Sequence, residues 1–252
     1  MLVRDLFVVV PFYNEASGIA ATLDALAAQS DKDFALVLVD NASSDRSAEV
    51  AMAWASTHSD LRIELISEAE KGTGAASDTG FRHAIARGAR FIARTDADCL
   101  PDSNWIRNIR AAFENEGLEL VIGQIKPRVD DYPPTPTDPF VLPVLLWVAE
   151  HFGRLHRRGP QFKYPYIMVA GNNMAITAAM YLRAGGFPRS RIEQLHEDRV
   201  LADNVRCLTV RTRKHDDVVV YNSTRRLRAY GRINTLLWYW DHKYRPAVVD
   251  VR

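Results

Sequence analysis

The stretch RFIARTDADC, residues 90–99, joins an apolar run to two aspartates that stand one residue apart. A short apolar run bounded by polar residues is typical of a buried strand. Core packing gives no reason for two carboxylates where such a strand ends, so Asp96 and Asp98 require either a turn or a ligand. The segments on both sides show which kind of fold surrounds them.

Around this stretch, short apolar runs alternate with segments of helical period. The predicted strands are residues 6–10, 35–40, 61–67, 90–96 and 118–129, and the segments with helical spacing are 19–29, 47–57, 74–87 and 104–114. This alternation predicts a parallel sheet with right-handed crossovers. Strands that are almost entirely apolar indicate that helices cover both faces of that sheet. We therefore predict an α/β fold.

The pattern changes after Val129, where the Pro-rich DDYPPTPTDP leads into a less regular region. There we expect a short helix that ends at Gly185 and Gly186, and a further acidic segment, EQLHEDRVLADNVR. Two strands are expected near the end of the chain, at residues 208–212 and 218–222.

The overall composition argues against several classes of partner. Lys and Arg number 32 against 31 Asp and Glu, so no net field attracts a polyanion, and nucleic-acid binding is not expected. The 2 cysteines are too few for a disulfide framework or a cysteine zinc site. Because the N-terminus lacks the regions of a signal peptide, we expect a cytoplasmic protein.

The longest apolar stretch, FVLPVLLWVAEHF (residues 140–152), is too short to cross a bilayer, which needs roughly 20 residues. No transmembrane helix is therefore predicted. The stretch runs into the basic GRLHRRG, so it could lie on a membrane surface. The alternative is a core helix with a solvated end.

Ligands of a parallel sheet bind beyond the carboxyl ends of its strands. Those ends are followed here by PFYNEAS (11–17), DNASSD (40–45), EAEKGTG (68–74) and DADC (96–99). Asp40 can accept hydrogen bonds from a nucleobase edge or from ribose hydroxyls, whereas Asp45 is expected to cap the next helix. Lys71 stands in a glycine-containing loop before a helix, where a cation and backbone N–H groups can meet a diphosphate.

The aspartate pair suits a divalent cation. Because a turn after the strand breaks the pleat, Asp96 and Asp98 can converge on one ion. Hard oxygen ligands of this kind favour Mg²⁺ or Mn²⁺. The alternative is an Asx turn that leads toward the helix at Asn104, and the pair alone does not decide between them.

Glu197 and Asp198 form a second acidic pair. Adjacent side chains on a helix are about 100° apart, so one of the two is expected to act and the other to support it. A partly desolvated carboxylate beside another acid has a raised pKa, as a general base requires. The alternative is the solvated face of a helix.

Six segments in this order resemble the family-2 glycosyltransferases, inverting enzymes of the GT-A fold that use nucleotide sugars. They are VVVPFYNEASGIAATLDAL, LVLVDNASSD, KGTGAASDTGFRHA, RTDADCLPDSNWI, VAGNNMAIT with AGGF, and HEDRVLADNVR. The resemblance runs from Leu6 to about Tyr221. It implies one GT-A domain over residues 1–252 with a mixed, mostly parallel sheet. Residues 1–129 would bind the nucleotide sugar, and residues 130–252 would bind the acceptor and supply the base.

The resemblance also implies a role for each matched residue. Nucleotide-sugar contacts are expected from Pro11, Tyr13, Glu15, Asp40, Lys71, Asp78, Asp96, Ala97, Gly171, Arg225 and Arg226. Asp98, with Asp96, is expected to bind Mn²⁺ or Mg²⁺ at the donor diphosphate, and Asp198 to act as the catalytic base with Glu197 beside it. The resemblance favours transfer of a hexose from a UDP- or GDP-sugar.

Two departures from the family pattern limit these expectations. Ser77 and Asp78 stand where many relatives carry an Arg-Asn pair, which leaves part of the phosphate or ribose contact open. The Gln-x-x-Arg-Trp motif of processive members is absent, and STRRLRAYGR (223–232) occupies roughly its place, so single-sugar transfer is expected. His215 and Asn222 are candidates for a late metal ligand.

Three other classes share parts of this pattern. A phosphatase of the haloacid dehalogenase type also uses Asp-x-Asp after a strand, but near its N-terminus and followed by Gly-Thr. A sugar-nucleotide pyrophosphorylase has a related sheet, yet its Gly-rich N-terminal signature is missing here. A non-catalytic sugar-nucleotide-binding protein would keep the donor residues without needing Asp198.

The acceptor is expected to be anionic or lipid-linked, with peripheral membrane contact. The reason is a group of basic and aromatic residues in the second half: Trp147, Arg154, Arg157, Arg158, Lys163, Tyr164 and Tyr166. The alternative is that the aromatic rings belong to the core and the cations to a solvated face.

Overall fold

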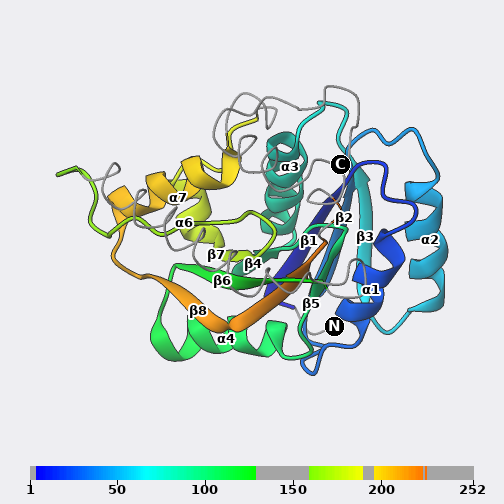
Figure 1. Ribbon diagram of the computed structural model, residues 1–252, viewed down its shortest axis with the longest axis horizontal. Coiled ribbons are helices and arrows are strands. Elements are labelled where there is room, and N and C mark those ends of the chain that lie inside the picture. The colour runs from blue at the N-terminus through cyan, green and yellow to red at the C-terminus, as the bar shows by residue number, and fades with distance from the viewer. Residues whose placement is uncertain (1–3, 129–158, 190–195, 224, 226–252) are drawn as a thin grey trace, which may run out of the picture.

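A single mixed sheet organises the chain, for which a computed structural model describes residues 4–128, 159–189, 196–223 and 225. The strands within these ranges are β1 (Leu6–Phe12), β2 (Ala35–Asp40), β3 (Arg62–Ser67), β4 (Phe91–Arg94), β5 (Cys99–Pro101), β6 (Leu120–Pro127), β7 (Met174–Thr177) and β8 (Thr212–Asn222). The helices are α1 (Ile19–Ala27), α2 (Ser47–Thr57), α3 (Thr73–Ala86), α4 (Trp105–Glu116), α6 (Ala178–Arg183) and α7 (Glu197–Leu208). The strand order is β3-β2-β1-β4-β7-β6-β8-β5 (Figure 1).

The first half of the chain forms the predicted parallel part of the sheet. β1 pairs in parallel with β2 and β4, and β2 pairs in parallel with β3. The register opposes Phe12 to Asp40, Asp40 to Ser67, and Val9 to Arg94. The carboxyl ends of these strands therefore lie at one edge, which carries the predicted functional loops.

The second half is a mixed extension of the sheet. β7 is antiparallel to both β4 and β6, β8 is parallel to β6, and β5 is antiparallel to β8. The strand predicted at residues 218–222 is confirmed as part of β8, which spans Thr212–Asn222. The separate strand predicted at residues 208–212 is wrong, because α7 extends to Leu208 and the strand begins at Thr212. The polar residues 213–217 resemble a loop in sequence, but the ladder crosses them with a register shift opposite Gly123 and Gln124.

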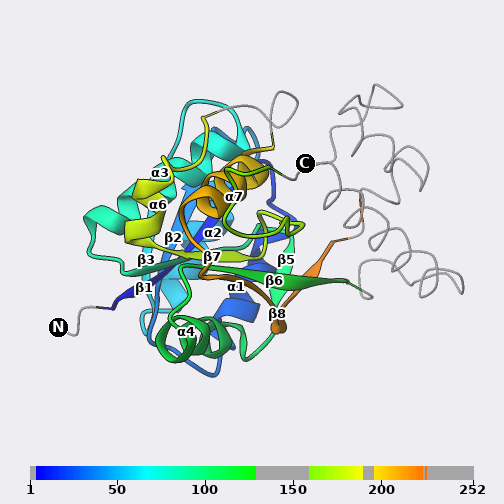
Figure 2. The same cartoon turned by 90° about the vertical axis from the view of Figure 1, so that its left-hand side faces the viewer.

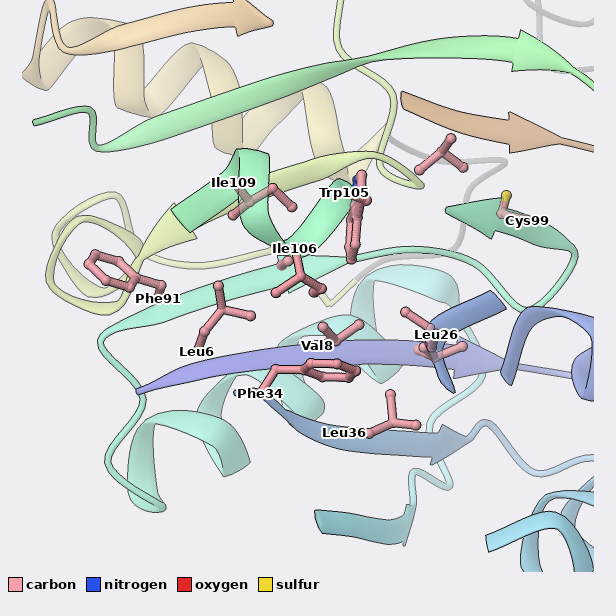
Figure 3. Close-up of a cluster of buried hydrophobic side chains, with 14 of the residues drawn as sticks. Leu6, Val8, Leu26, Phe34, Leu36, Phe91, Cys99, Trp105, Ile106 and Ile109 are labelled. Atoms are coloured by element: carbon pink, nitrogen blue, oxygen red, sulfur yellow. The ribbon is translucent and has the colours of Figure 1, made fainter. Parts of the chain in front are cut away.

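Helices cover both faces of the sheet, as the apolar strands predict. Along β1, Leu6 and Val8 belong to the core that contains α1 and α4, whereas Phe7 and Val9 belong to the core that contains α3, α6 and α7. Figure 2 shows α4 on one side of the sheet and α3, α6 and α7 on the other. In Figure 3 the first core is seen where Leu6 and Val8 meet Ile106 of α4. No helix of the described ranges is long and apolar enough to cross a bilayer, and residues 140–152 lie outside those ranges.

Candidate functional site

The loops that follow β1 and β2 are bound to each other at the carboxyl edge. Asn14 takes a positive φ of 53°, a conformation that asparagine tolerates better than most residues. Its side-chain Oδ1 accepts a hydrogen bond of 2.8 Å from the N–H of Ser44, and its own N–H donates to Ser43 Oγ at 3.1 Å. The N–H of Glu15 donates to Ser47 Oγ at 2.7 Å. The first loop is thus held in one place beside Asp40.

Asn41 shapes the loop that carries Lys71. Its Nδ2 donates to the carbonyls of Glu68 at 3.0 Å and Glu70 at 2.8 Å, and its Oδ1 accepts from the N–H of Gly72 at 2.9 Å. Lys71 Nζ consequently lies 5.4 Å from the centroid of the Tyr13 ring. Asp40 at the end of β2, and Tyr13 and Lys71 in the loops after β1 and β3, lie at the same edge, as expected for a nucleotide pocket. Sequence reasoning missed Asn41, although its position directly after Asp40 was a signal.

Glu15, Asp96 and Asp98 form an acidic group, and Arg225 contacts two of its members, Glu15 and Asp98. Arg225 Nη1 donates to Glu15 Oε2 at 2.8 Å, and its Nη2 also pairs with Oε1 of Glu15 and lies 3.3 Å from Asp98 Oδ2. Burial raises the pKa of Glu15; Arg225 opposes this shift, and the charges of Asp98 and Asp96 add to it. A cation is therefore favoured at this point.

The backbone between the two aspartates is fixed by α1. The carbonyl of Ala97 accepts a hydrogen bond of 2.8 Å from Thr22 Oγ1, and Ala97 is buried. The Asx turn that leads to the helix is formed by Asp102, whose Oδ1 accepts a hydrogen bond of 3.1 Å from the N–H of Asn104. That turn does not involve Asp96 or Asp98, so it does not explain them.

These carboxylates fit a hard divalent ion that a ligand helps to hold. The oxygens of Asp96 and Asp98 are the donors that Mg²⁺ and Mn²⁺ accept, and Asp98 already lies against one cationic group, Arg225. In the described part of the chain no three His, Cys, Asp or Glu side chains form a closed metal cage. Phosphate oxygens of a donor would complete such an open site.

Of the two candidates for a late metal ligand, only Asn222 lies near the aspartates. Asn222 is paired with Cys99 across the β5–β8 ladder, and Cys99 Sγ lies 3.4 Å from Asp98 Oδ1 and 3.2 Å from Asn222 Oδ1. His215 is paired with Gly123, four residues before Pro127, the partner of Asn222. Four strand steps correspond to roughly 13 Å, which places His215 away from the site.

Arg94, the last residue of β4, connects Asp96 to the first turn of α7. Its Nε and Nη2 donate to Asp96 Oδ1 at 3.2 and 3.1 Å, and its Nη1 donates to Glu197 Oε1 at 3.0 Å. Only 2% of the Arg94 side chain is exposed. Burial alone would lower the pKa of Arg94, but the charges of Asp96 and Glu197 raise it above its ordinary value. Sequence reasoning missed this residue.

Glu197 and Asp198 take different partners in the first turn of α7, in agreement with their angular separation. Glu197 pairs with Arg94, whereas Asp198 Oδ2 accepts from the N–H of Gly171 at 2.8 Å. Burial raises the pKa of Asp198 to about 6, the charge of Glu197 adds to this shift, and Arg94 opposes it. A carboxylate with this pKa is suited to accept a proton near neutral pH.

Asp78 lies on the buried face of α3, where three side chains engage it. Its Oδ1 accepts from Tyr181 Oη at 2.8 Å, its Oδ2 from Arg82 Nε at 2.9 Å, and Arg189 Nη1 lies 3.5 Å from Oδ2. Tyr181 Oη in turn accepts from the N–H of Phe187. These contacts give Asp78 a structural task between α3 and the segment after α6, and its direct contact with a nucleotide stays a prediction.

The described part of the expected acceptor segment packs onto α7. Lys163 Nζ donates to the carbonyl of Leu208 at 3.1 Å, and Arg206 Nε donates to the carbonyl of Tyr164 at 3.1 Å. The ring of Tyr166 has its centroid 5.6 Å from Arg206 Cζ. The ring of Tyr164 is partly buried against the hydrophobic core, which matches the alternative for this residue. Five predicted residues lie outside the described ranges, namely Trp147, Arg154, Arg157, Arg158 and Arg226.

The sheet, its helices and the acidic carboxyl edge define a GT-A domain. The chain belongs to glycosyl transferase family 2, whose sequence profile matches residues 7–182. It is 31% identical over 121 residues to Glycosyltransferase AglE of Haloferax volcanii, a match that covers 47% of this chain and 38% of that protein. It is 32% identical over 114 residues to Uncharacterized glycosyltransferase EpsJ of Bacillus subtilis, which covers 45% of this chain and 32% of the relative. The chain thus matches well under half the length of either relative.

Solved structures confirm the predicted fold. Mannosyltransferase PcManGT from Pyrobaculum calidifontis, in complex with GDP-Man and Mn²⁺, matches with a TM-score of 0.66 and 26% identity over 86% of this chain and 56% of that chain. S. aureus TarS 1–349 in complex with UDP matches with a TM-score of 0.64 over 87% of this chain and 60% of that chain. At 16% identity, TarS bears on the fold alone.

Proposed function

We propose that this chain is a glycosyltransferase that moves one sugar from a nucleoside-diphosphate sugar to an acceptor hydroxyl with inversion. The observation that carries the proposal is the link through Arg94 between Asp96, in the acidic donor group, and Glu197, beside Asp198. This link supports one site in which the acidic group binds the donor and Asp198, with its raised pKa, accepts a proton. The described strands of both halves share one sheet, which supports one GT-A domain.

We assign the donor site to the carboxyl edge of the parallel strands. Asp40 and Tyr13 would contact the nucleoside, Lys71 the phosphates, and Asp96 and Asp98 would hold Mn²⁺ or Mg²⁺. The divalent ion would supply neutralisation of the charge that develops on the departing diphosphate. The mannosyltransferase PcManGT, solved with GDP-Man and Mn²⁺, supports a nucleotide sugar and a divalent ion as the ligands to test first.

We assign the role of general base to Asp198. Its carboxylate would accept the proton of the acceptor hydroxyl while the hydroxyl oxygen forms a bond to the anomeric carbon of the sugar. The bond between that carbon and the diphosphate oxygen breaks on the opposite side, so the configuration inverts. The backbone N–H of Gly171 keeps Asp198 in its orientation.

The stereochemistry of the product tests this assignment. NMR of the product should show an anomeric configuration opposite to that of the donor, and retention would contradict the role of Asp198. Asp198→Asn should bind donor and Mn²⁺ as the unchanged protein does, but transfer about 100-fold more slowly. Donor binding without turnover of any acceptor would instead favour a non-catalytic nucleotide-sugar-binding protein.

The acceptor is best found by a screen. Soluble glycans, phosphorylated metabolites and polyprenyl-linked sugars should be compared with each donor that binds. We propose an anionic or lipid-linked acceptor from the basic sequence around residues 154–163. Binding to anionic vesicles should then weaken with salt and in an Arg157→Ser, Arg158→Ser variant, because screening shortens electrostatic reach to about 10 Å at 0.1 M. Turnover of neutral soluble acceptors alone, unchanged in that variant, would contradict this choice.

A further inference from the structure

We propose that Arg94 is a positioning residue that couples occupancy of the donor site to the placement of the α7 N-terminus, which carries Asp198. This inference rests on the proposed function for the meaning of both sites. The coupling itself depends only on the contacts of Arg94. Its guanidinium bonds Asp96 with Nε and Nη2 and Glu197 with Nη1. The two acids are separated by 101 positions of sequence, as their numbers show.

The contacts with Asp96 and Glu197 require a planar group that donates several hydrogen bonds in different directions. Asp96 Oδ1 receives two N–H groups at 3.2 and 3.1 Å, while Glu197 Oε1 receives the third at 3.0 Å. A guanidinium presents several donors in fixed directions, so a shift of one acid moves the group that holds the other. An ammonium group is a compact point charge and cannot reproduce this pair of directions.

The surroundings keep the guanidinium in this place. A Cβ atom at Gly171 would lie 2.8 Å from Arg94 Nη1 and 3.0 Å from Cζ, so glycine leaves the room that the cation occupies. The ring of Phe187 lies on another side, with its centroid 5.6 Å from Arg94 Cζ. Gly171 also donates its N–H to Asp198. Gly171, Phe187 and the first turn of α7 therefore meet around one cation.

The charges of Asp96, Arg94 and Glu197 explain why a movement of Asp96 would be transmitted to α7. Glu197 is almost fully buried, with 5% of its side chain exposed, and it depends on Arg94 for a counter-charge. Asp96 is more accessible, with 34% of its side chain exposed, and belongs to the acidic donor group. When Asp96 turns toward a bound cation and diphosphate, Arg94 must follow it or pair more strongly with Glu197. Either response changes the environment of the first turn of α7.

Hydrogen exchange detects this coupling without requiring catalysis. In the unchanged protein, Mn²⁺ with GDP, or with UDP if GDP does not bind, should slow exchange at Gly171 and at residues 198–201. In Arg94→Met this response should be lost, and the dissociation constant of the nucleotide in Mn²⁺ should rise about tenfold, as expected for a lost bond to a charged group. If neither nucleotide binds, Mn²⁺ alone serves as the probe.

Two further variants separate positioning from folding. Arg94→Lys keeps the charge and should restore the melting temperature lost in Arg94→Met, but not the exchange response at α7. Gly171→Ala keeps the arginine and displaces its guanidinium, which is the flexible end of a side chain, so it should fold and still lose the response. The control is Arg110→Met, which removes an arginine from Asp5 and Asp31 near the start of β1 and should keep the response.

The outcomes are distinguishable from failure of the proposed function. An unchanged α7 response in folded Arg94→Lys and Gly171→Ala would overturn the coupling. Absence of any response in the unchanged protein on saturation with Mn²⁺ would overturn it as well. A response that follows these expectations, in a protein that transfers no sugar, would support the coupling and contradict the glycosyltransferase assignment.

Discussion

Asp198 and Gly171 are joined by a hydrogen bond of 2.8 Å from the backbone N–H of Gly171 to Oδ2 of the carboxylate. The N–H of Arg199 donates to the other oxygen, Oδ1, at 2.6 Å. Both bonds favour the charged form of Asp198, yet burial and the neighbouring charge of Glu197 outweigh them and raise its pKa to about 6. The two hydrogen bonds therefore fix the orientation of the carboxylate, while its raised pKa makes it a stronger base than an exposed aspartate.

The rate of sugar transfer should depend on this pKa. The base must be deprotonated, so the rate should rise with pH, reach half its maximum near pH 6 and level off above it. At pH 5 about one-tenth of the maximum should remain. Glu197→Gln removes the neighbouring negative charge and should move the half-maximum to lower pH. A rate that does not change between pH 5 and 8 would exclude Asp198 as the base.

Removal of the Asp98 carboxylate should abolish the effect of metal on donor binding. In Asp98→Ala, the dissociation constant of GDP or UDP in Mn²⁺ should rise by about tenfold or more, since a bond to a charged group is lost. Addition of EDTA should weaken binding to the unchanged protein and leave the variant almost unaffected. Calorimetry measures both effects, and Asp24→Asn, on α1 beside Trp54, is the control. Equal affinity with and without EDTA in the unchanged protein would contradict the metal site.

Much of the parallel half could be predicted from sequence because its signals are local. β2 and α2 have the predicted limits, and the first four strands and helices all lie where periodicity placed them. The short strands β5 and β7 were missed, since three or four residues carry no period of their own. Cys99, for example, is in a strand because Asn222 pairs with it, and sequence alone does not show a contact over that separation.

The residues of the candidate site likewise fall into those that the sequence could predict and those that it could not. Asp96, Asp98 and Asp198 could be proposed because carboxylates at strand and helix ends are conspicuous against apolar neighbours. Arg94 could not, because an arginine that ends an apolar strand is indistinguishable from the polar boundary of that strand. Its partner Glu197 is 103 residues away, and only the fold brings the two together.

Arg225 should contribute to donor binding. Its guanidinium lies against Glu15 and Asp98, so it is already held at the acidic group where the diphosphate is proposed to bind. Arg225→Ala should raise the dissociation constant of the nucleoside diphosphate about tenfold, through loss of a charge-assisted contact. Titration of GDP and UDP in Mn²⁺ measures the change. Tighter nucleotide binding in the variant would show that Arg225 competes with the metal and does not hold the phosphates.

Gly80 should be required for the packing of α3 on the sheet. A Cβ atom at this position would overlap Val9 Cγ1 on β1 and would lie 2.8 Å from Val39 Cγ2 on the neighbouring strand β2. Overpacking of this kind costs about 1–3 kcal/mol, so Gly80→Ala should lower the free energy of unfolding by that amount. Chemical denaturation followed by circular dichroism measures the loss.

Ser77, one turn earlier on the buried face of α3, is the matched control for Gly80→Ala. Its Oγ is buried and has no hydrogen-bond partner within the described part of the chain. Replacing it with alanine removes a desolvated hydroxyl without adding volume, so Ser77→Ala should leave the free energy of unfolding unchanged or raise it slightly. Equal loss in both variants would mean that α3 is sensitive to any change on this face. A loss confined to Gly80→Ala would show that the close approach of α3 to β1 and β2 sets the limit.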